Sequence, residues 1–219
     1  MDGNQWIAPA IILTFLGILA NNVTAFFINK KKINADISLA EKKFQFDKDQ
    51  LVHKRRFELA EGLLADAYHF RDLMGFVRNG ATFGVEGTSR KPEQNEPEND
   101  KSMKDSYFVP VERLQKENDF ISTFFAKQYT AQAQFGPEAV RAFELFSRSI
   151  LEVRTASYML IDGVGRHNNE KEFTNQLLCD IWERYALALK KEDLVGKKIS
   201  EGVSTFEKLC KPVLEWKGA

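Results

Sequence analysis

Residues 6–28 read WIAPAIILTFLGILANNVTAFFI, and this stretch decides how the rest of the chain is interpreted. No charged side chain occurs from Gly3 to Asn29, and three lysines follow directly at 30–32. A helix rises about 1.5 Å per residue and the hydrocarbon core of a bilayer is about 30 Å thick, so a helix over 6–28 is long enough to cross it. The pattern predicts a transmembrane anchor in residues 1–29.

Candidate anchoring residues stand at both ends of the predicted span. They are Trp6 at one end and Lys30, Lys31 and Lys32 at the other, because aromatic rings favour the membrane interface and lysines attract anionic headgroups. Residues 30–56 hold nine Lys or Arg against four Asp or Glu, whereas no Lys or Arg precedes the span. The positive-inside rule therefore predicts a single-pass protein of the inner (plasma) membrane, with its N-terminus outside and its remainder in the cytoplasm. A cleaved signal peptide fits less well, since no basic residue precedes the apolar run.

Three polar residues interrupt the predicted span. Asn21, Asn22 and Thr24 could find partners across a helix interface and so mark self-association. The alternative is that a long apolar run tolerates them, and the sequence favours this interpretation.

The overall composition excludes a general affinity for nucleic acid. Lys and Arg together number 31 and so do Asp and Glu, so the chain carries no net field that would attract a polyanion. The two cysteines, Cys179 and Cys210, lie on apolar stretches without a CxxC motif, and we expect them to be buried free thiols.

Residues 30–56 are expected to form a basic helical stalk. Apolar residues recur there at heptad-like spacing, as Ile33, Ile37, Ala40, Phe44 and Leu51. So narrow an apolar face is typical of a coiled coil, and it predicts either pairing between copies through 33–51 or a stalk that rests on its own domain. Asp47 at one position of the repeat weakens the first alternative.

Residues 57–219 are expected to form an all-α antiparallel bundle of about four to five helices. Apolar residues recur there at helical spacing, no stretch alternates with period two, and Gly136-Pro137 predicts a break between two helices. Pro110 is expected to open a helix. The polar, Gly- and Pro-containing segment at about 80–106 predicts a mobile loop, and 18 phenylalanines can fill the core.

The strongest catalytic candidate is the pair Asp66 and His69, three residues apart on one helix. A carboxylate and an imidazole at this spacing can share a metal in a helical bundle, but a dinuclear site needs a second such pair, which the sequence lacks. No GxSxG, HExxH or P-loop motif occurs. The sequence therefore favours a protein without catalytic residues and without a cofactor.

Two function classes remain open on the sequence. The first is a membrane-tethered interaction or regulatory bundle with an unidentified protein partner, in which Lys54, Arg55 and Arg56 could dock headgroups or an acidic partner. The second is a metal- or ligand-binding sensor or enzyme built around Asp66 and His69.

Overall fold

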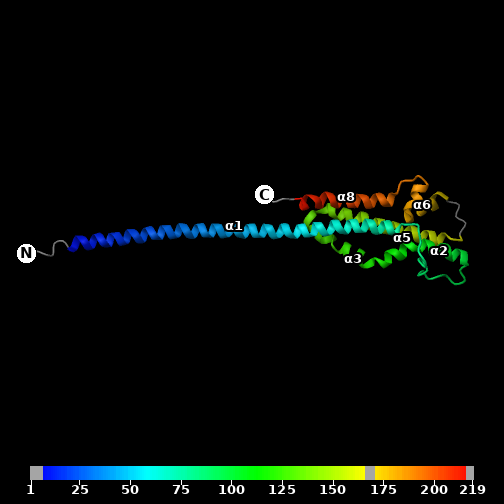
Figure 1. Cartoon of the computed structure of the whole chain (residues 1–219), viewed down its shortest axis with the longest axis horizontal. Coiled ribbons are helices and arrows are strands. Elements are labelled where there is room, and N and C mark those ends of the chain that lie inside the picture. The colour runs from blue at the N-terminus through cyan, green and yellow to red at the C-terminus, as the bar shows by residue number, and fades with distance from the viewer. Residues whose placement is uncertain (1–6, 166–170, 216–219) are drawn as a thin grey trace, which may run out of the picture. The chain divides into compact units, whose positions relative to one another are not determined.

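The structure is a computed structural model that describes residues 7–165 and 171–215; the side chains of residues 7–14, 18 and 20 lie outside the description. The described residues form eight helices and no strand, so the prediction of an all-α protein is confirmed. Figure 1 labels several of them. The helices are α1 (Ile7–Val77), α2 (Glu98–Lys116), α3 (Asn118–Ala126), α4 (Gln128–Phe135), α5 (Pro137–Gly163), α6 (Lys171–Ile181), α7 (Glu183–Ala188) and α8 (Leu194–Leu214).

The chain divides into two compact units, Met1–Arg55 and Arg56–Ala219, which we call unit 1 and unit 2. Helix α1 contributes to both, because it continues without a break through the division (Figure 1). In unit 1 the described residues, 7–55, all belong to this one helix. Unit 2 contains the remainder of α1 together with α2 to α8.

The predicted membrane span is contradicted. Among the residues that the structure describes, no helix is both long enough and apolar enough to cross a bilayer. The polar residues Asn21, Asn22 and Thr24 of the predicted span lie within α1. The finding overturns the predicted anchor at 6–28 and, with it, the predicted inner-membrane location.

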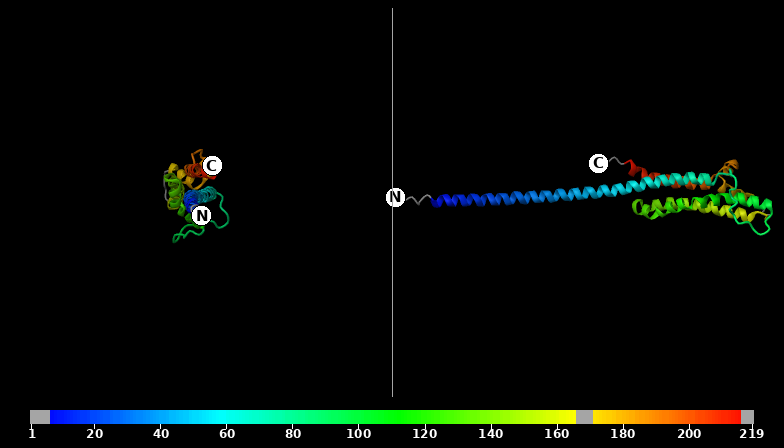
Figure 2. Two further views of the ribbon diagram at one scale, coloured as in Figure 1. Left: turned by 90° about the vertical axis from the view of Figure 1, so that its left-hand side faces the viewer. Right: turned by 60° about the horizontal axis from the view of Figure 1, so that its bottom comes forward.

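In unit 2, α1 packs antiparallel to the run formed by α2, α3 and α4. As the residue number rises along α1, the number of its contact partner falls. The contacts pair Arg56 with Phe135, Asp66 with Lys127, His69 with Phe120, and Phe76 with Arg113. Figure 2 shows these helices and α8 running alongside one another.

Five phenylalanine side chains from four helices form the centre of unit 2. Phe70, Phe124, Phe143, Phe146 and Phe206 are all at most 1% exposed. Their rings lie 4.7 Å apart between Phe70 and Phe146, and 5.0 Å apart between Phe124 and Phe143. Aromatic pairs at these separations gain attraction beyond the area that they bury, so the cluster joins α1, α3, α5 and α8 into one core.

Several boundaries differ from those that the sequence predicts. Pro110 lies inside α2, which begins twelve residues earlier at Glu98 and so includes the end of the predicted loop 80–106. The predicted helix that ends near Phe135 is divided at Glu117 and Lys127. The break at Gly136-Pro137 is confirmed, because Gly136 has a φ of 80° and α5 begins at the proline.

Two glycine substitutions should change stability in opposite directions. A Cβ at Gly202 of α8 would lie 2.8 Å from Cε1 of Phe146, whereas a Cβ at Gly75 of α1 would meet nothing within 4 Å. Gly202→Ala should therefore lower the free energy of unfolding by about 1–3 kcal/mol through overpacking. Gly75→Ala should raise it by roughly 0.5–1 kcal/mol, since alanine loses less backbone entropy in a helix.

Urea unfolding of the two variants beside the unsubstituted chain measures both effects. Equal behaviour of the two variants would show that Phe146 does not pack against α8 as described.

Candidate interaction site

Half of the phenylalanines do not lie in a core. Nine of the 18 are exposed, six are buried and three are partly buried, which corrects the expectation that most of them fill the bundle. Five of the exposed rings belong to unit 1: Phe15, Phe26, Phe27, Phe44 and Phe46. Because the described part of unit 1 is one helix, it contains no second element that could cover them.

The heptad residues of unit 1 form an exposed apolar stripe along α1. We call the residues at positions 26, 30, 33, 37, 40, 44, 47 and 51 the seam. The exposed fractions of its large apolar members are 63% for Phe26, 57% for Ile33, 52% for Ile37, 72% for Phe44 and 50% for Leu51. Successive seam positions are three or four residues apart, so they lie on one side of the helix. Contiguous exposed apolar surface is a feature of interaction sites, so the seam is the candidate site of this chain.

The structure places three of the four predicted anchoring residues, the lysines at 30–32. Trp6 lies outside the described residues, and Lys30, Lys31 and Lys32 are exposed consecutive residues of α1. Three consecutive residues of a helix point in three directions about 100° apart, so only Lys30 shares the seam.

The predicted docking residues Lys54, Arg55 and Arg56 are exposed and lie where unit 1 meets unit 2 in the sequence. The guanidinium carbon of Arg56 lies 5.2 Å from the ring centroid of Phe135, which is a cation–π contact within unit 2. Docking of these residues to lipid headgroups or to an acidic partner stays a prediction.

Asp66 and His69 have different environments. The Asp66 carboxylate accepts a hydrogen bond of 2.7 Å from the ammonium group of Lys127, and the His69 ring stacks on Phe120 with centroids 4.1 Å apart. Within the described ranges, no three His, Cys, Asp or Glu side chains are grouped so that they could hold a metal ion. The geometry thus gives this pair contacts with Lys127 and Phe120 rather than with further metal ligands.

The sequence does not predict the buried arginine of α2. Arg113 is 1% exposed, and its guanidinium donates to the backbone oxygens of Phe76, Asn79 and Ala81 and to both carboxylate oxygens of Glu86. A planar guanidinium with five donors is suited to this arrangement, because it satisfies several carbonyls at once. Arg113 thereby fixes the end of α1 and the following connection to α2.

A second buried arginine joins α1 to the C-terminal helices. Both terminal nitrogens of Arg78 donate to the Asp193 carboxylate, at 2.9 and 2.7 Å, and its side chain also donates to the backbone oxygens of Asp180 and Cys179. Asp193 in turn accepts from the backbone N–H of Gly196 and caps α8. One bidentate pair therefore fixes both the end of α1 and the start of α8.

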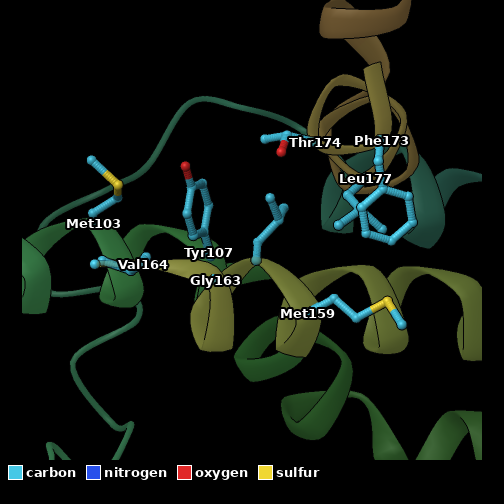
Figure 3. A pocket seen from close by; sticks show the side chains of 10 residues that line it. Met103, Tyr107, Met159, Gly163, Val164, Phe173, Thr174 and Leu177 are labelled. Atoms are coloured by element: carbon cyan, nitrogen blue, oxygen red, sulfur yellow. The ribbon is translucent and has the colours of Figure 1, made fainter. Parts of the chain in front are cut away.

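A half-open pocket lies between α2, α5 and α6, and its volume is about 290 Å³. Figure 3 shows the Tyr107 ring between Met103 on one side and Phe173 and Leu177 on the other. Burial is the main cause that raises the pKa of the Tyr107 hydroxyl. Its lining within residues 7–165 and 171–215 is apolar apart from hydroxyl groups and backbone, and these residues bring together no acid, base and nucleophile as hydrolysis or group transfer would require.

The two thiols are buried and free, as the sequence predicts. Burial raises the pKa of Cys210 to about 11, and burial is also the main cause that raises the pKa of Cys179. Since the thiolate is the reactive form, neither cysteine is prepared to act as a nucleophile.

No protein-family model matches the chain, and no curated protein or solved structure is significantly similar to it. The candidate site is accordingly argued from the geometry, and the seam of unit 1 is the surface that the geometry distinguishes most clearly.

The Arg113–Glu86 pair should make the free energy of unfolding depend on pH in the acid range. The hydrogen bond from Arg113 is the largest cause that lowers the pKa of Glu86 from 4.5 to about 2. A carboxyl group whose pKa is lower in the folded state contributes stability above its unfolded pKa, and loses that contribution as the pH falls toward the folded value. The unsubstituted chain should therefore be more stable than Glu86→Gln at pH 6, and the difference should shrink between pH 4.5 and about 2.

Urea unfolding at a series of pH values measures this difference. Glu61→Gln is the matched control, since Glu61 is exposed on α1, and it should change stability little at any pH. A constant difference between Glu86→Gln and the unsubstituted chain down to pH 2 would contradict the assigned pair.

Proposed function

We propose that the protein is a helical interaction protein, which works by pairing the seam of unit 1 with a helix of another polypeptide. The observation that carries the proposal is the exposure of the large apolar seam residues on a unit that contains one helix in its described part. Most helical stability in proteins comes from packing of an apolar face, so a long helix with such a face is best accounted for by a partner.

The contacts that the charged side chains of unit 2 make support an interaction role rather than a catalytic one. The buried charged residues Arg78 and Arg113 use their donors within unit 2. Asp66 and His69 contact Lys127 and Phe120. Unit 2 then acts as a stable body to which the binding helix is joined.

The width of the seam indicates what kind of partner it binds in the proposed interaction. A binding face of two residues in every seven is the face that a coiled coil buries, whereas packing into a globular core needs a wider face. The expected partner is thus a helix with a similar narrow apolar stripe, paired side by side with α1 over the seam.

Removing seam side chains should abolish the complex, while removing equally apolar side chains from another face should not. The seam variant is Ile37→Ser with Phe44→Ser. The matched control is Leu39→Ser with Phe46→Ser, which removes an aliphatic and an aromatic side chain, also seven residues apart and also exposed, from off the seam. Burial of such a side chain contributes roughly 1.5–3 kcal/mol, so the seam variant should bind its partner at least about 100-fold more weakly.

Sedimentation of the full chain, isolated under mild conditions, measures the outcome. The unsubstituted chain and the control should sediment as a complex heavier than the 25.1 kDa of one chain, and the seam variant as the single chain. A single-chain mass for the unsubstituted protein, or a complex that survives the seam substitutions, would overturn the proposal.

A further inference from the structure

The seam has a spacing that is symmetrical under reversal. Its positions are 26, 30, 33, 37, 40, 44, 47 and 51, which alternate steps of four and three residues. Subtracting the residue number of any seam position from 77 gives the residue number of another seam position. A second copy of the helix that runs in the opposite direction can therefore place a seam residue opposite every seam residue of the first.

Two charged residues on the seam oppose parallel pairing of two copies. In a parallel dimer in register, each seam residue faces its own counterpart. Lys30 would then face Lys30 of the second copy, and Asp47 would face Asp47. Like charges at the centre of an interface repel and lose hydration, so both layers would oppose association.

The charges that flank the seam oppose the parallel arrangement as well. In a parallel dimer, the residue just before seam position 37 or 44 faces a residue five positions later on the other helix. Asp36 would face Glu41 of the second copy, and Lys43 would face Lys48. The symmetry repeats each repulsion, so four flanking contacts between like charges would form.

In the antiparallel arrangement, Lys30, Asp47, Asp36 and Lys43 face opposite charges in place of like charges. Residues whose numbers add to 77 face each other, so Lys30 faces Asp47 of the second copy, and the symmetry repeats this pair. Asp36 and Lys43 flank the same side of the seam, and their numbers add to 79, so they lie within about 3 Å of the same height. The apolar layers pair Phe26 with Leu51, Ile33 with Phe44, and Ile37 with Ala40.

We infer that the partner of the seam is a second copy of this chain, bound antiparallel. The numbers of the two seam residues that face each other in each layer add to 77. The inference rests on the proposed function and adds to it the identity, direction and register of the partner. Charge complementarity selects this occupant, since Lys30, Asp47, Asp36 and Lys43 meet opposite charges in a reversed copy and like charges in a parallel copy. Size complementarity agrees, because the smallest seam residue, Ala40, faces the branched side chain of Ile37.

Cross-linking between differently tagged full chains tests direction and register. One chain carries Ile33→Cys and the other carries Phe44→Cys, and the unsubstituted chain, whose two cysteines are buried, gives the background. A short thiol-to-thiol cross-linker should join the two variants to each other, and should join neither variant to itself. Positions 33 and 44 are eleven residues, or about 16 Å, apart along a helix, so the two directions are well separated.

The results that contradict this expectation separate a failure of the inference from a failure of the proposed function. Cross-linking of each variant to itself shows a parallel dimer and overturns the inference, while the proposed function stands. The same holds if the complex contains a different protein and no second copy. A chain that forms no complex at all overturns the proposed function.

A charge substitution gives a second, independent readout. In the antiparallel dimer, Asp47→Lys places a second ammonium group opposite Lys30, and it should weaken self-association by on the order of tenfold, because two attractive pairs become repulsive. Lys30→Asp added to Asp47→Lys reverses both charges and should restore the original affinity. An unchanged affinity of the single variant overturns the inference, since a parallel dimer would only exchange one like-charge layer for another.

Discussion

A helix on its own cannot remove its apolar side chains from water, and this constraint governs unit 1. The described part of unit 1 is one helical segment, yet it carries the exposed seam and five exposed phenylalanine rings. Burial of apolar surface is the main favourable contribution to association, at roughly 25 cal/mol per Å². A segment of this composition is therefore expected to exist as part of a complex, in which the seam is covered.

In unit 2 the apolar side chains are removed from water by packing of its own helices against one another. Its five-phenylalanine centre joins four helices. The buried Arg113 binds the end of α1, and the buried Arg78, which follows α1, binds backbone oxygens of α6 and the cap residue of α8. Arg113 donates to three backbone oxygens at the end of α1 and in the connection that follows it, and Arg78 connects α1 to the cap of α8. Unpaired groups of these kinds would be costly when buried, so each arginine both rigidifies a connection and depends on its partners.

The helical periodicity, the break at Gly136-Pro137 and the buried thiols could be predicted because they depend on local spacing and on residue type. The buried arginines could not be, since their partners lie about 25 to 115 residues away and only the folded chain brings them together. Pro110 inside α2 was mistaken for a helix start, because a first-turn proline and an internal proline give the same local signal.

The predicted membrane span is contradicted, because no helix among the described residues is both long enough and apolar enough to cross a bilayer. The candidate interaction site was partly predictable: the heptad spacing at 33–51 is visible in the sequence, and the structure adds the exposure of those residues. The direction of pairing follows only when the flanking charges are considered together with the seam.

The central claim is that the seam of unit 1 is covered by a second copy, and amide hydrogen exchange as a function of protein concentration tests it most directly. If a second copy covers the seam, amides of residues 26–51 should exchange more slowly as the concentration rises, while those of α2 and α5 do not change. Exchange of residues 26–51 that is equally fast at every concentration would contradict the claim, because an uncovered helix has no interface to protect its amides.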